Sequence, residues 1–405
     1  MARKMKDSGI EWIGKIPEGW SIARGKHILT LLQRAVFPTD GVITCFRDGE
    51  VTLRSNRRED GFTVSLKEIG YQGIEPGDLV VHGMDGFAGS IGISDSRGKS
   101  SPVLVVLDSS QDKKYLMYYL RSMAYNNVFL ALSTGIRVRS CDLKWNKLAD
   151  LLYLVPPIVE QHKLVSFLDE KCSEIDAMLS KTRASIEEYK KLKQAVITQA
   201  VTTLNCPNVK LKYLMDIIVD CPHETPIYTF TGNYLVIRTS DQSLASLRCD
   251  EYMYRLDEAE YKKRTRRLTL DKDDIVYGRE GSWGLACLVP QSNKYCLGQR
   301  VMQFRCNTRL LYPKYAMYAL NSETVYMQGA LDTIGSTAPH VNISTICNYL
   351  LPVPALTEQK EVADYLDAKC AEIDGLIVKK EQLVKELERY KKSLIYEVVT
   401  GKREV

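Results

Sequence analysis

The chain has 405 residues, of which 45% are hydrophobic and 26% charged, and its formal net charge is +5. This balance excludes a wholly disordered, collagen-like or membrane-embedded protein, and the length predicts two or more compact units. The small positive excess neither indicates nor excludes a nucleic-acid-binding protein, because such proteins often concentrate their charge on one face.

The cysteines and the N-terminus bear on the cellular compartment. Eleven cysteines, an odd number, are scattered without a Cys-x-x-Cys pair, which favours reduced thiols. Residues 1–9 are polar and mixed in charge, without the apolar core of a signal peptide. The longest apolar stretch, 151–159, contains two prolines and is far shorter than the roughly 20 residues of a membrane span. We expect a soluble, cytoplasmic chain.

In chain order, the predicted elements form a globular unit, a long helix, a second globular unit and a second long helix. Short β-type runs and one amphipathic helix are predicted in each unit, at 78–82, 103–107 and 114–123, and again at 274–277, 301–304 and 313–320. Each unit is therefore predicted to be a mixed α+β domain of about 150 residues.

The second half of the chain repeats the first. Residues 168–176, Leu-Asp-Glu-Lys-Cys-Ser-Glu-Ile-Asp, return at 366–374 as Leu-Asp-Ala-Lys-Cys-Ala-Glu-Ile-Asp. The offset is 198 residues, the difference between Asp374 and Asp176, and it holds without a gap until Val201-Thr202 matches Val399-Thr400. Such sustained self-similarity indicates a duplicated architecture. The globular units have diverged far more than the segments that follow them.

The repeated segments are predicted to be long helices. From residue 160 to residue 202 there is no proline and no glycine, and apolar residues recur at spacings of three, four and seven. A helix of about 43 residues is roughly 65 Å long. It cannot bury its apolar stripe inside one small domain, so the two helices are expected to pair. Because the first helix leads to the second unit, where the second helix begins, the pair is expected to be antiparallel.

This pairing predicts an approximate twofold relation between the units, with the two chain termini close together. The predicted fold class is α+β: two mixed α/β domains in pseudo-twofold tandem, separated by two long helices packed as an antiparallel coiled coil. The alternative is that each helix caps its own unit or mediates dimerisation. The residues predicted at the helix-pair interface are Leu168, Ile175, Leu179, Ile186, Tyr189, Leu366, Ile373, Ile377, Val384 and Leu387.

A glycine-rich segment follows one β-type run in each unit. Its glycines are Gly83, Gly86, Gly89 and Gly92 in the first unit and Gly278, Gly281 and Gly284 in the second. A phosphate-binding loop is one interpretation, but no helix start follows closely. The pattern favours a tight turn between strands.

Basic side chains gather in both units. They are Arg54, Arg57, Arg58, Arg137 and Arg139 in the first unit, and Lys262, Lys263, Arg264, Arg266, Arg267, Arg279 and Arg300 in the second. Such clusters can neutralise phosphates, and arginine can read guanine edges with two hydrogen bonds. Each cluster alone is also compatible with a solvated surface. Their presence in both units favours DNA binding.

The sequence predicts no catalytic residue and no metal site. The glycines before Lys99-Ser100 have the wrong spacing for a nucleotide-binding loop, and no motif orients a base amine for methylation. The five histidines fall without metal-ligand spacing. A cryptic nuclease or methyltransferase activity is the competing enzymatic hypothesis.

The chain resembles the specificity subunit of a Type I restriction-modification system. The resemblance rests on the tandem plan and on a signature before the long helix, namely Pro156-Pro157, Glu160-Gln161 and Leu168-Asp169. It also rests on the N-terminal stretch 8–20 and on Ser133-Thr134-Gly135, which Arg137 and Arg139 follow closely. Together these segments cover nearly all of the chain.

The resemblance implies a noncatalytic protein with two target-recognition domains, each reading one half of a split DNA sequence. These domains would be residues 1–155 and 205–353, and the spacer helices 156–204 and 354–405. The helices would fix the half-site separation and dock two methyltransferase subunits, which bind S-adenosylmethionine and methylate adenine. Motor-nuclease subunits that join the complex would bind ATP. This chain itself would need no cofactor.

The second unit departs from the family pattern. Gly335 is followed by Ser336, Thr337, Ala338 and Pro339 rather than by a basic run, and His340 is the one candidate for DNA contact there. Because the two units differ, the resemblance implies an asymmetric target. The competing structural hypothesis is a coiled-coil scaffold with two protein-binding heads.

Overall fold

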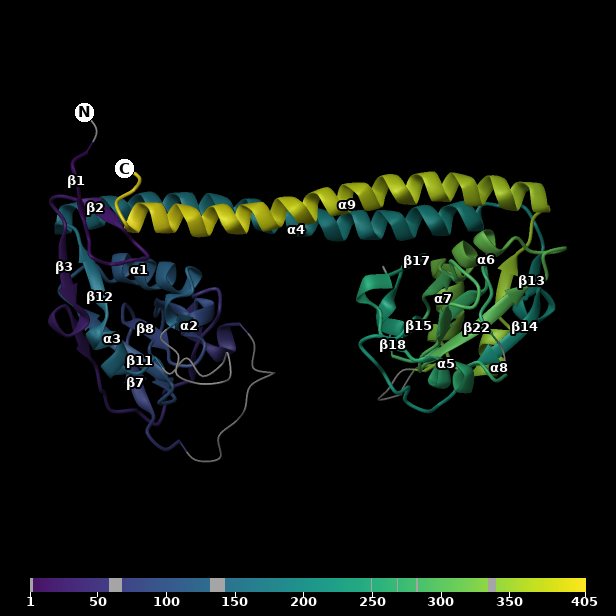
Figure 1. Ribbon diagram of the computed structural model, residues 1–405, viewed down its shortest axis with the longest axis horizontal. Coiled ribbons are helices and arrows are strands. Elements are labelled where there is room, and N and C mark those ends of the chain that lie inside the picture. The colour runs from purple at the N-terminus through teal and green to yellow at the C-terminus, as the bar shows by residue number, and fades with distance from the viewer. Residues whose placement is uncertain are drawn as a thin grey trace. The chain divides into compact units, whose positions relative to one another are not determined.

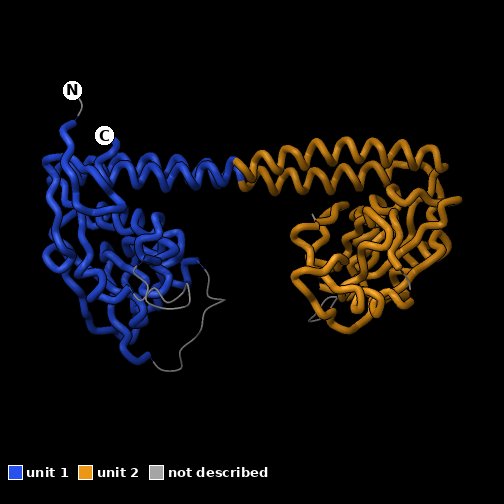
Figure 2. The backbone as a smooth tube through the Cα atoms, viewed as in Figure 1, with its two compact units in different colours: residues 1–182, 383–405 blue, residues 183–382 orange. Residues whose placement is uncertain are grey.

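The structure is a computed structural model that describes residues 3–57, 68–131, 143–248, 250–267, 269–281, 283–333 and 340–405 (Figure 1). It divides into two compact units, residues 1–182 with 383–405 and residues 183–382 (Figure 2). Each long helix is shared by both units. The predicted division instead treats the long helices, 156–204 and 354–405, as segments separate from the globular domains.

Unit 1 is built on a four-stranded antiparallel sheet of order β4-β11-β8-β9, with helix α1 against β8 and β9. The sheet strands are β4 (Leu29–Leu31), β8 (Leu79–His82), β9 (Ile91–Ile93) and β11 (Leu104–Ser109). The two-stranded pairs are β1 (Met5–Asp7) with β2 (Lys15–Pro17), β3 (Ser21–Arg24) with β12 (Leu152–Val155), β5 (Ile43–Cys45) with β6 (Val51–Leu53), and β7 (Gln72–Ile74) with β10 (Gly98–Ser100). The helices are α1 (Lys113–Tyr125), α2 (Val128–Ala131) and α3 (Trp145–Asp150), with 3-10 turns η1 (Gly25–His27), η2 (Arg54–Asn56) and η3 (Gly86–Ala88).

Unit 2 repeats the antiparallel sheet with the order β14-β22-β19-β20 and adds a three-stranded sheet of order β18-β15-β21. The strands are β13 (Asn208–Lys210), β14 (Met215–Asp220), β15 (Tyr234–Ile237), β16 (Gln242–Ser243), β17 (Ser246–Leu247), β18 (Arg255–Leu256), β19 (Ile275–Gly278), β20 (Ala286–Leu288), β21 (Tyr295–Leu297), β22 (Val301–Cys306) and β23 (Leu350–Pro352). The helices are α5 (Glu258–Arg264), α6 (Pro313–Leu320), α7 (Glu323–Ala330) and α8 (Ile343–Cys347), with 3-10 turns η4 (Leu211–Tyr213), η5 (Thr239–Asp241) and η6 (Asp250–Tyr252).

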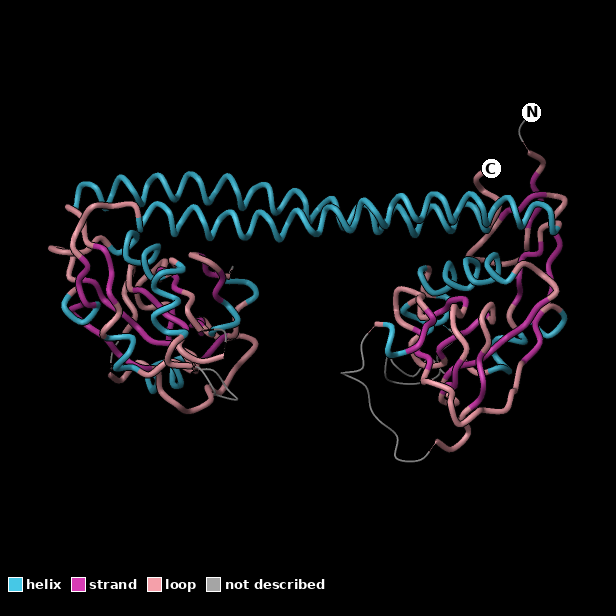
Figure 3. The backbone as a smooth tube through the Cα atoms, turned by 180° about the vertical axis from the view of Figure 1, so that it is seen from behind, coloured by secondary structure: helices cyan, strands magenta, loops and turns pink. Residues whose placement is uncertain are grey.

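The two four-stranded sheets confirm the duplicated plan and the predicted α+β class (Figure 3). Their central strands β8 and β19 are fully buried along most of their length, because both faces are covered. The predicted amphipathic helices are α1 and α6, whose buried tyrosines and leucines pack on these sheets. The predicted glycine-rich turns join β8 to β9 and β19 to β20, with Gly89 at φ +96° and Gly284 at φ +91°.

The two long helices are α4 (Ile158–Thr202) and α9 (Leu356–Val399), and they pair antiparallel in each unit. In unit 1 the first half of α4 meets the last part of α9, where Lys391 Nζ lies 2.6 Å from Asp176 Oδ1. In unit 2 the end of α4 meets the start of α9, where Lys193 Nζ lies 2.8 Å from Asp374 Oδ2. Within the described residues, no helix has the length and apolar character needed to cross a membrane.

The residues predicted at the helix-pair interface divide into two groups. Six are buried, namely Leu168, Ile175, Leu179, Ile186, Leu366 and Ile373. Four are half-buried, namely Tyr189, Ile377, Val384 and Leu387. In unit 1 these stripes join the same core as α1 and the sheet, so the helices cap the globular part as well as pairing with each other.

The Glu-Gln signature ties each long helix to the unit beside it. The buried Gln161 side chain accepts a hydrogen bond from the Asp112 main-chain N–H at 3.0 Å and donates to the Pro156 carbonyl at 2.8 Å. Its counterpart Gln359 accepts from the Tyr312 N–H at 2.7 Å and donates to the Pro354 carbonyl at 2.9 Å. Each glutamine thereby supplies hydrogen-bond partners to main-chain groups that burial would otherwise leave unpaired.

The Leu-Asp signature acts in the same way. Asp169 accepts a hydrogen bond from the Tyr118 hydroxyl at 2.8 Å and pairs with Lys114. In unit 2, Asp367 accepts from the Tyr318 hydroxyl at 2.8 Å and pairs with Lys314. The leucines beside these aspartates, Leu168 and Leu366, are fully buried. The motif that links the two halves of the sequence is therefore a structural joint.

Candidate nucleic-acid interface

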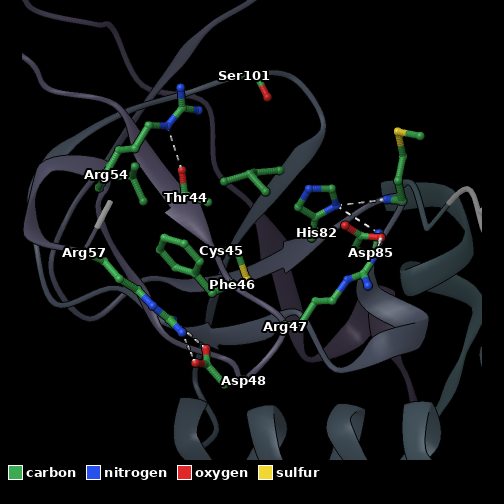
Figure 4. Close-up of a pocket in the computed structure, with 13 residues that line it drawn as sticks. Thr44, Cys45, Phe46, Arg47, Asp48, Arg54, Arg57, His82, Asp85 and Ser101 are labelled. Carbon is green, nitrogen blue, oxygen red and sulfur yellow. Dashed lines mark hydrogen bonds and ion pairs between the residues drawn. The ribbon is translucent and has the colours of Figure 1, made fainter. Parts of the chain in front are cut away.

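A cavity of about 820 Å³ opens beside the β5–β6 hairpin of unit 1 (Figure 4). Side chains reach it from the hairpin, from η2 and the residue after it, and from the end of β8. The lining residues are Ile43, Thr44, Cys45, Phe46, Arg47, Asp48, Arg54, Arg57, His82, Met84, Asp85, Ser101 and Leu104. Two of the predicted DNA-binding arginines, Arg54 and Arg57, thus meet in one concave site.

Arg57 is held by two carboxylates and one aromatic ring. Its Nη2 lies 2.6 Å from Asp48 Oδ2, and its Nη1 donates to Asp48 Oδ1 at 3.0 Å and to Glu50 Oε2 at 2.9 Å. The guanidinium carbon lies 4.2 Å from the centre of the Phe46 ring. The hydrogen bond with Asp48 raises the pKa of Arg57. Burial acts to raise the pKa of Asp48, but the hydrogen bonds from Arg57 and the Glu50 main chain lower it.

The other arginines at the cavity are also oriented by neighbours. Arg54 Nε donates to Thr44 Oγ1 at 3.2 Å, and Arg47 Nη2 donates to Asp85 Oδ1 at 3.1 Å. The Arg47 side chain is 58% exposed. Both side chains line the cavity.

The tip of the hairpin is fixed from beneath by α1. The buried Arg121 donates from its guanidinium to the main-chain carbonyl of Asp48. Gly49 has φ +91°, and a Cβ at this position would lie 2.5 Å from Arg121 Cζ. The Phe46 N–H also donates to the Glu50 carbonyl at 2.8 Å. The acidic partners of Arg57 therefore sit on a rigid turn.

His82 lies at the end of β8 and faces the cavity in its neutral form. Its Nδ1 accepts hydrogen bonds from the N–H groups of Met84, at 3.2 Å, and Asp85, at 3.0 Å. Burial lowers the pKa of His82, although the charge of Asp85 opposes this shift. With Nδ1 occupied as an acceptor, Nε2 carries the proton of the neutral ring.

The described residues at this site offer no evident reaction chemistry. Burial raises the pKa of the Cys45 thiol to about 12, so it stays protonated at neutral pH. Across the part of the chain that the structure describes, no group of three or more histidine, cysteine, aspartate and glutamate side chains could hold a metal ion.

In unit 2, the predicted basic cluster of α5 has both exposed and buried members. Lys262 and Lys263 are exposed and pair with Glu258 at 2.7 Å and Glu224 at 2.6 Å, respectively. Arg266 and Arg267 follow the helix and are exposed.

Arg264 lies inside unit 2 rather than on its surface. Its guanidinium donates to the main-chain carbonyls of Leu297 and Glu224, both at 3.0 Å, and to those of Pro222 and Gly298 at longer range. These bonds join α5 to β21 and to the segment after β14. Arg264 is among the residues predicted to bind DNA, but its side chain is buried and supports the interior of unit 2 instead.

The remaining predicted residues of unit 2 come together at the end of β19. Arg279 is 8% exposed, and its Nη2 lies 2.6 Å from Glu280 Oε1 and 3.3 Å from Asp220 Oδ2. The Arg279 N–H donates to the carbonyl of Arg300, whose own side chain is 62% exposed. His340 is exposed and forms a β-bridge with Glu280. Of these three, Arg300 and His340 are accessible.

Three predicted residues, Arg58, Arg137 and Arg139, lie outside the described residues. The structure instead adds residues that the sequence analysis did not select, namely Phe46, Arg47, Asp48 and His82. One sequence signal for the hairpin was available, because Asp48-Gly49 is a dipeptide typical of tight hairpin turns.

Comparisons with known proteins agree with this architecture. A family model described as the Type I restriction modification DNA specificity domain matches residues 220–386. The StySPI specificity subunit of Salmonella potsdam is 22% identical over 90% of this chain and 84% of its own length. The EcoBI specificity subunit of Escherichia coli is 26% identical over 32% of this chain, and that match spans only 27% of the relative.

Two solved structures share the fold over almost the whole chain. One is a chain from a structure that addresses complex assembly and conformational transition of the type I R-M system, with a TM-score of 0.72 at 15% identity, covering 96% of this chain and 99% of that chain. The other is the HsdS subunit from Thermoanaerobacter tengcongensis, with a TM-score of 0.51 at 15% identity, covering 98% of this chain and 100% of that chain. Residues 220–386 thus carry a Type I restriction modification DNA specificity domain, and the chain as a whole is related in sequence and fold to the specificity subunits of Type I restriction-modification systems.

Proposed function

We propose that this chain is the DNA-binding specificity subunit of a Type I restriction-modification complex and reads a bipartite, asymmetric target. Residues 1–155 and 205–353 act as the two target-recognition domains, each reading one half-site on double-stranded DNA. One observation carries this proposal: the two units keep the same sheet order and the same glutamine and aspartate joints but differ in their exposed basic residues.

The divergence has a direct consequence for recognition. In unit 1, Arg54 and Arg57 line a cavity together with Phe46. In unit 2, the exposed basic side chains lie on and after α5 and at Arg300. Different donor arrangements read different base edges, so the two half-sites differ in sequence.

The helices α4 and α9 set the distance between the half-sites and dock two methyltransferase subunits. The repeated ion pairs of Lys193 with Asp374 and of Lys391 with Asp176 support a fixed register for such a ruler. The chain itself is not an enzyme. S-adenosylmethionine binds to the methyltransferase subunits, and ATP binds to the motor-nuclease subunits. The complex works in the cytoplasm.

A selection experiment tests the function. The purified full chain is mixed with a library of randomised duplex DNA, and bound molecules are sequenced. We expect enrichment of two short, different sequences at one fixed separation. A protein scaffold with two protein-binding heads would enrich no sequence, and methyl transfer by the chain alone would contradict a noncatalytic role.

Sequencing methylated bases in the host, with and without this gene, supplies the second test. We expect a single bipartite motif to lose its adenine methylation when the gene is deleted. An unchanged methylation pattern would contradict the link to a methyltransferase.

A further inference from the structure

We propose that Arg57 is a specificity-determining residue of unit 1 and that it reads a guanine in the half-site bound there. This inference rests on the proposed function and names the base and the side chain that recognise each other. The base edge would be bound in the cavity beside the β5–β6 hairpin.

The hydrogen bonds of Arg57 leave one specific edge of its guanidinium available. Arginine has five N–H donors in a fixed plane. Both N–H groups of Nη1 donate hydrogen bonds, to Asp48 and Glu50, and Nη2 lies 2.6 Å from Asp48 Oδ2 in an ion pair. Among the described residues, neither Nε nor Nη2 donates a hydrogen bond. These two donors are parallel neighbours, and together they match the O6 and N7 acceptors of guanine.

The local charge favours a base over a phosphate. Asp48 and Glu50 both contact Arg57, so this group of three side chains carries a net charge of −1 when all are ionised. A phosphate approaching the free edge would meet two carboxylates behind a single cation. A guanine edge carries no net charge, so the two carboxylates repel it less than they repel a phosphate. The nearby Arg47 is already paired with Asp85.

The site is also held in a defined orientation before DNA arrives. The guanidinium carbon lies 4.2 Å from the centre of the Phe46 ring, and Phe46 is buried. Arg121 and Gly49 fix the turn that carries Asp48 and Glu50. A two-stranded ribbon of this kind fits the major groove, where the guanine O6 and N7 are exposed. The Arg57 side chain is therefore already ordered in the free protein, so DNA binding costs little additional side-chain entropy.

The test compares the full chain with its Arg57→Lys variant on the selected target. Lysine keeps the charge but has no planar pair of donors. The wild type is expected to prefer guanine at one position of the unit 1 half-site by about tenfold or more. Arg57→Lys is expected to lose this preference while keeping every preference in the unit 2 half-site. Retained unit 2 selectivity shows that unit 2 is folded, and retained preferences at the other positions of the unit 1 half-site show that unit 1 is folded.

A modified base and a matched variant sharpen the result. Replacing that guanine by 7-deazaguanine removes only the N7 acceptor. It is expected to weaken wild-type binding severalfold and to leave Arg57→Lys unaffected. The control is Arg24→Lys on β3, an exposed arginine paired with Asp150 outside the cavity, which is expected to behave as wild type.

Three outcomes overturn the inference. The first is equal weakening of Arg57→Lys on all sequences, which would identify a backbone contact. The second is an unchanged preference in Arg57→Lys. In both cases wild-type sequence selection would persist, so the proposed function would stand. The third, no sequence selection by the wild-type chain, would overturn the inference and the proposed function together.

Discussion

Lys193 on α4 reaches Asp374 on α9, with 2.8 Å between Nζ and Oδ2 and only 8% of the lysine side chain exposed. The same pair recurs 198 residues away along both partners, where Lys391 meets Asp176. In each pair the two residue numbers add to 567, so one antiparallel register holds in both units. The duplication in the sequence thus includes the contacts that align the helices.

Reversing the charge at this joint tests its contribution. Lys193→Glu places two carboxylates together and is expected to lower the free energy of unfolding by about 1 kcal/mol. Adding Asp374→Lys restores opposite charges and is expected to recover most of the loss. Thermal unfolding of the full chain measures both effects.

The matched control is Lys190→Glu, three residues earlier on the same helix, where Lys190 pairs with Glu187 and both side chains are more than half exposed. This exposed pair is expected to contribute only a few tenths of a kcal/mol. A Lys193→Glu variant as stable as Lys190→Glu would contradict a role for Lys193 in the helix pairing.

The buried glutamines give a prediction that separates the two units. Gln161→Leu removes the partner of the Asp112 N–H and the Pro156 carbonyl, and stranded polar groups of this kind cost about 1–3 kcal/mol each. Hydrogen exchange is expected to rise around α1 and the start of α4. Gln359→Leu is expected to have the same effect around α6 and the start of α9.

Gln199→Leu is the control, because Gln199 is exposed on α4. It is expected to leave exchange in both units unchanged. If Gln161→Leu and Gln359→Leu raised exchange equally across the whole chain, the two glutamines would not be local joints.

We expect His82 to make the free energy of unfolding depend on pH. Its folded pKa lies below the ordinary value because burial disfavours the charged ring, so the unfolded chain binds a proton first as the pH falls. The stabilising contribution is complete above about pH 6.5, the ordinary histidine pKa, and is lost as the pH falls below it. The wild type should therefore lose stability from pH 8 to pH 5 relative to His82→Asn, which cannot titrate. Parallel stability curves for the two proteins would contradict this assignment.

The long helices and turns were predictable because their signals are local. Unbroken apolar spacing defines α4 and α9, and repeated glycines define the turns after β8 and β19. The repeat itself also predicted the antiparallel pairing, since the chain must return along the first helix.

The residues predicted to contact DNA could not be sorted in this way. Lys263 and Arg264 are neighbours in one basic run. Lys263 is exposed, whereas Arg264 is buried and donates hydrogen bonds to four main-chain carbonyls. Arg57 acquires its carboxylate partners only when the β5–β6 hairpin folds back, and Arg121 reaches that hairpin from α1. Exposure and hydrogen bonding of this kind depend on tertiary packing, which a run of residue types does not encode.

The shared register makes the proposed ruler testable by a paired deletion. Removing 180–186 from α4 and 381–387 from α9 takes out one heptad opposite another, because these residues also obey the sum of 567. Both ion pairs, Lys193 with Asp374 and Lys391 with Asp176, can then reform. Each helix is shortened by about 10 Å, close to the length of three base pairs. We expect the shortened chain to lose its preference for the native half-site gap and to select a shorter one, measured with targets whose gap varies one base pair at a time.

Deleting 180–186 alone puts the two pairs out of register and is expected to destabilise the chain. An unchanged gap preference in the paired deletion would show that α4 and α9 do not set the spacing.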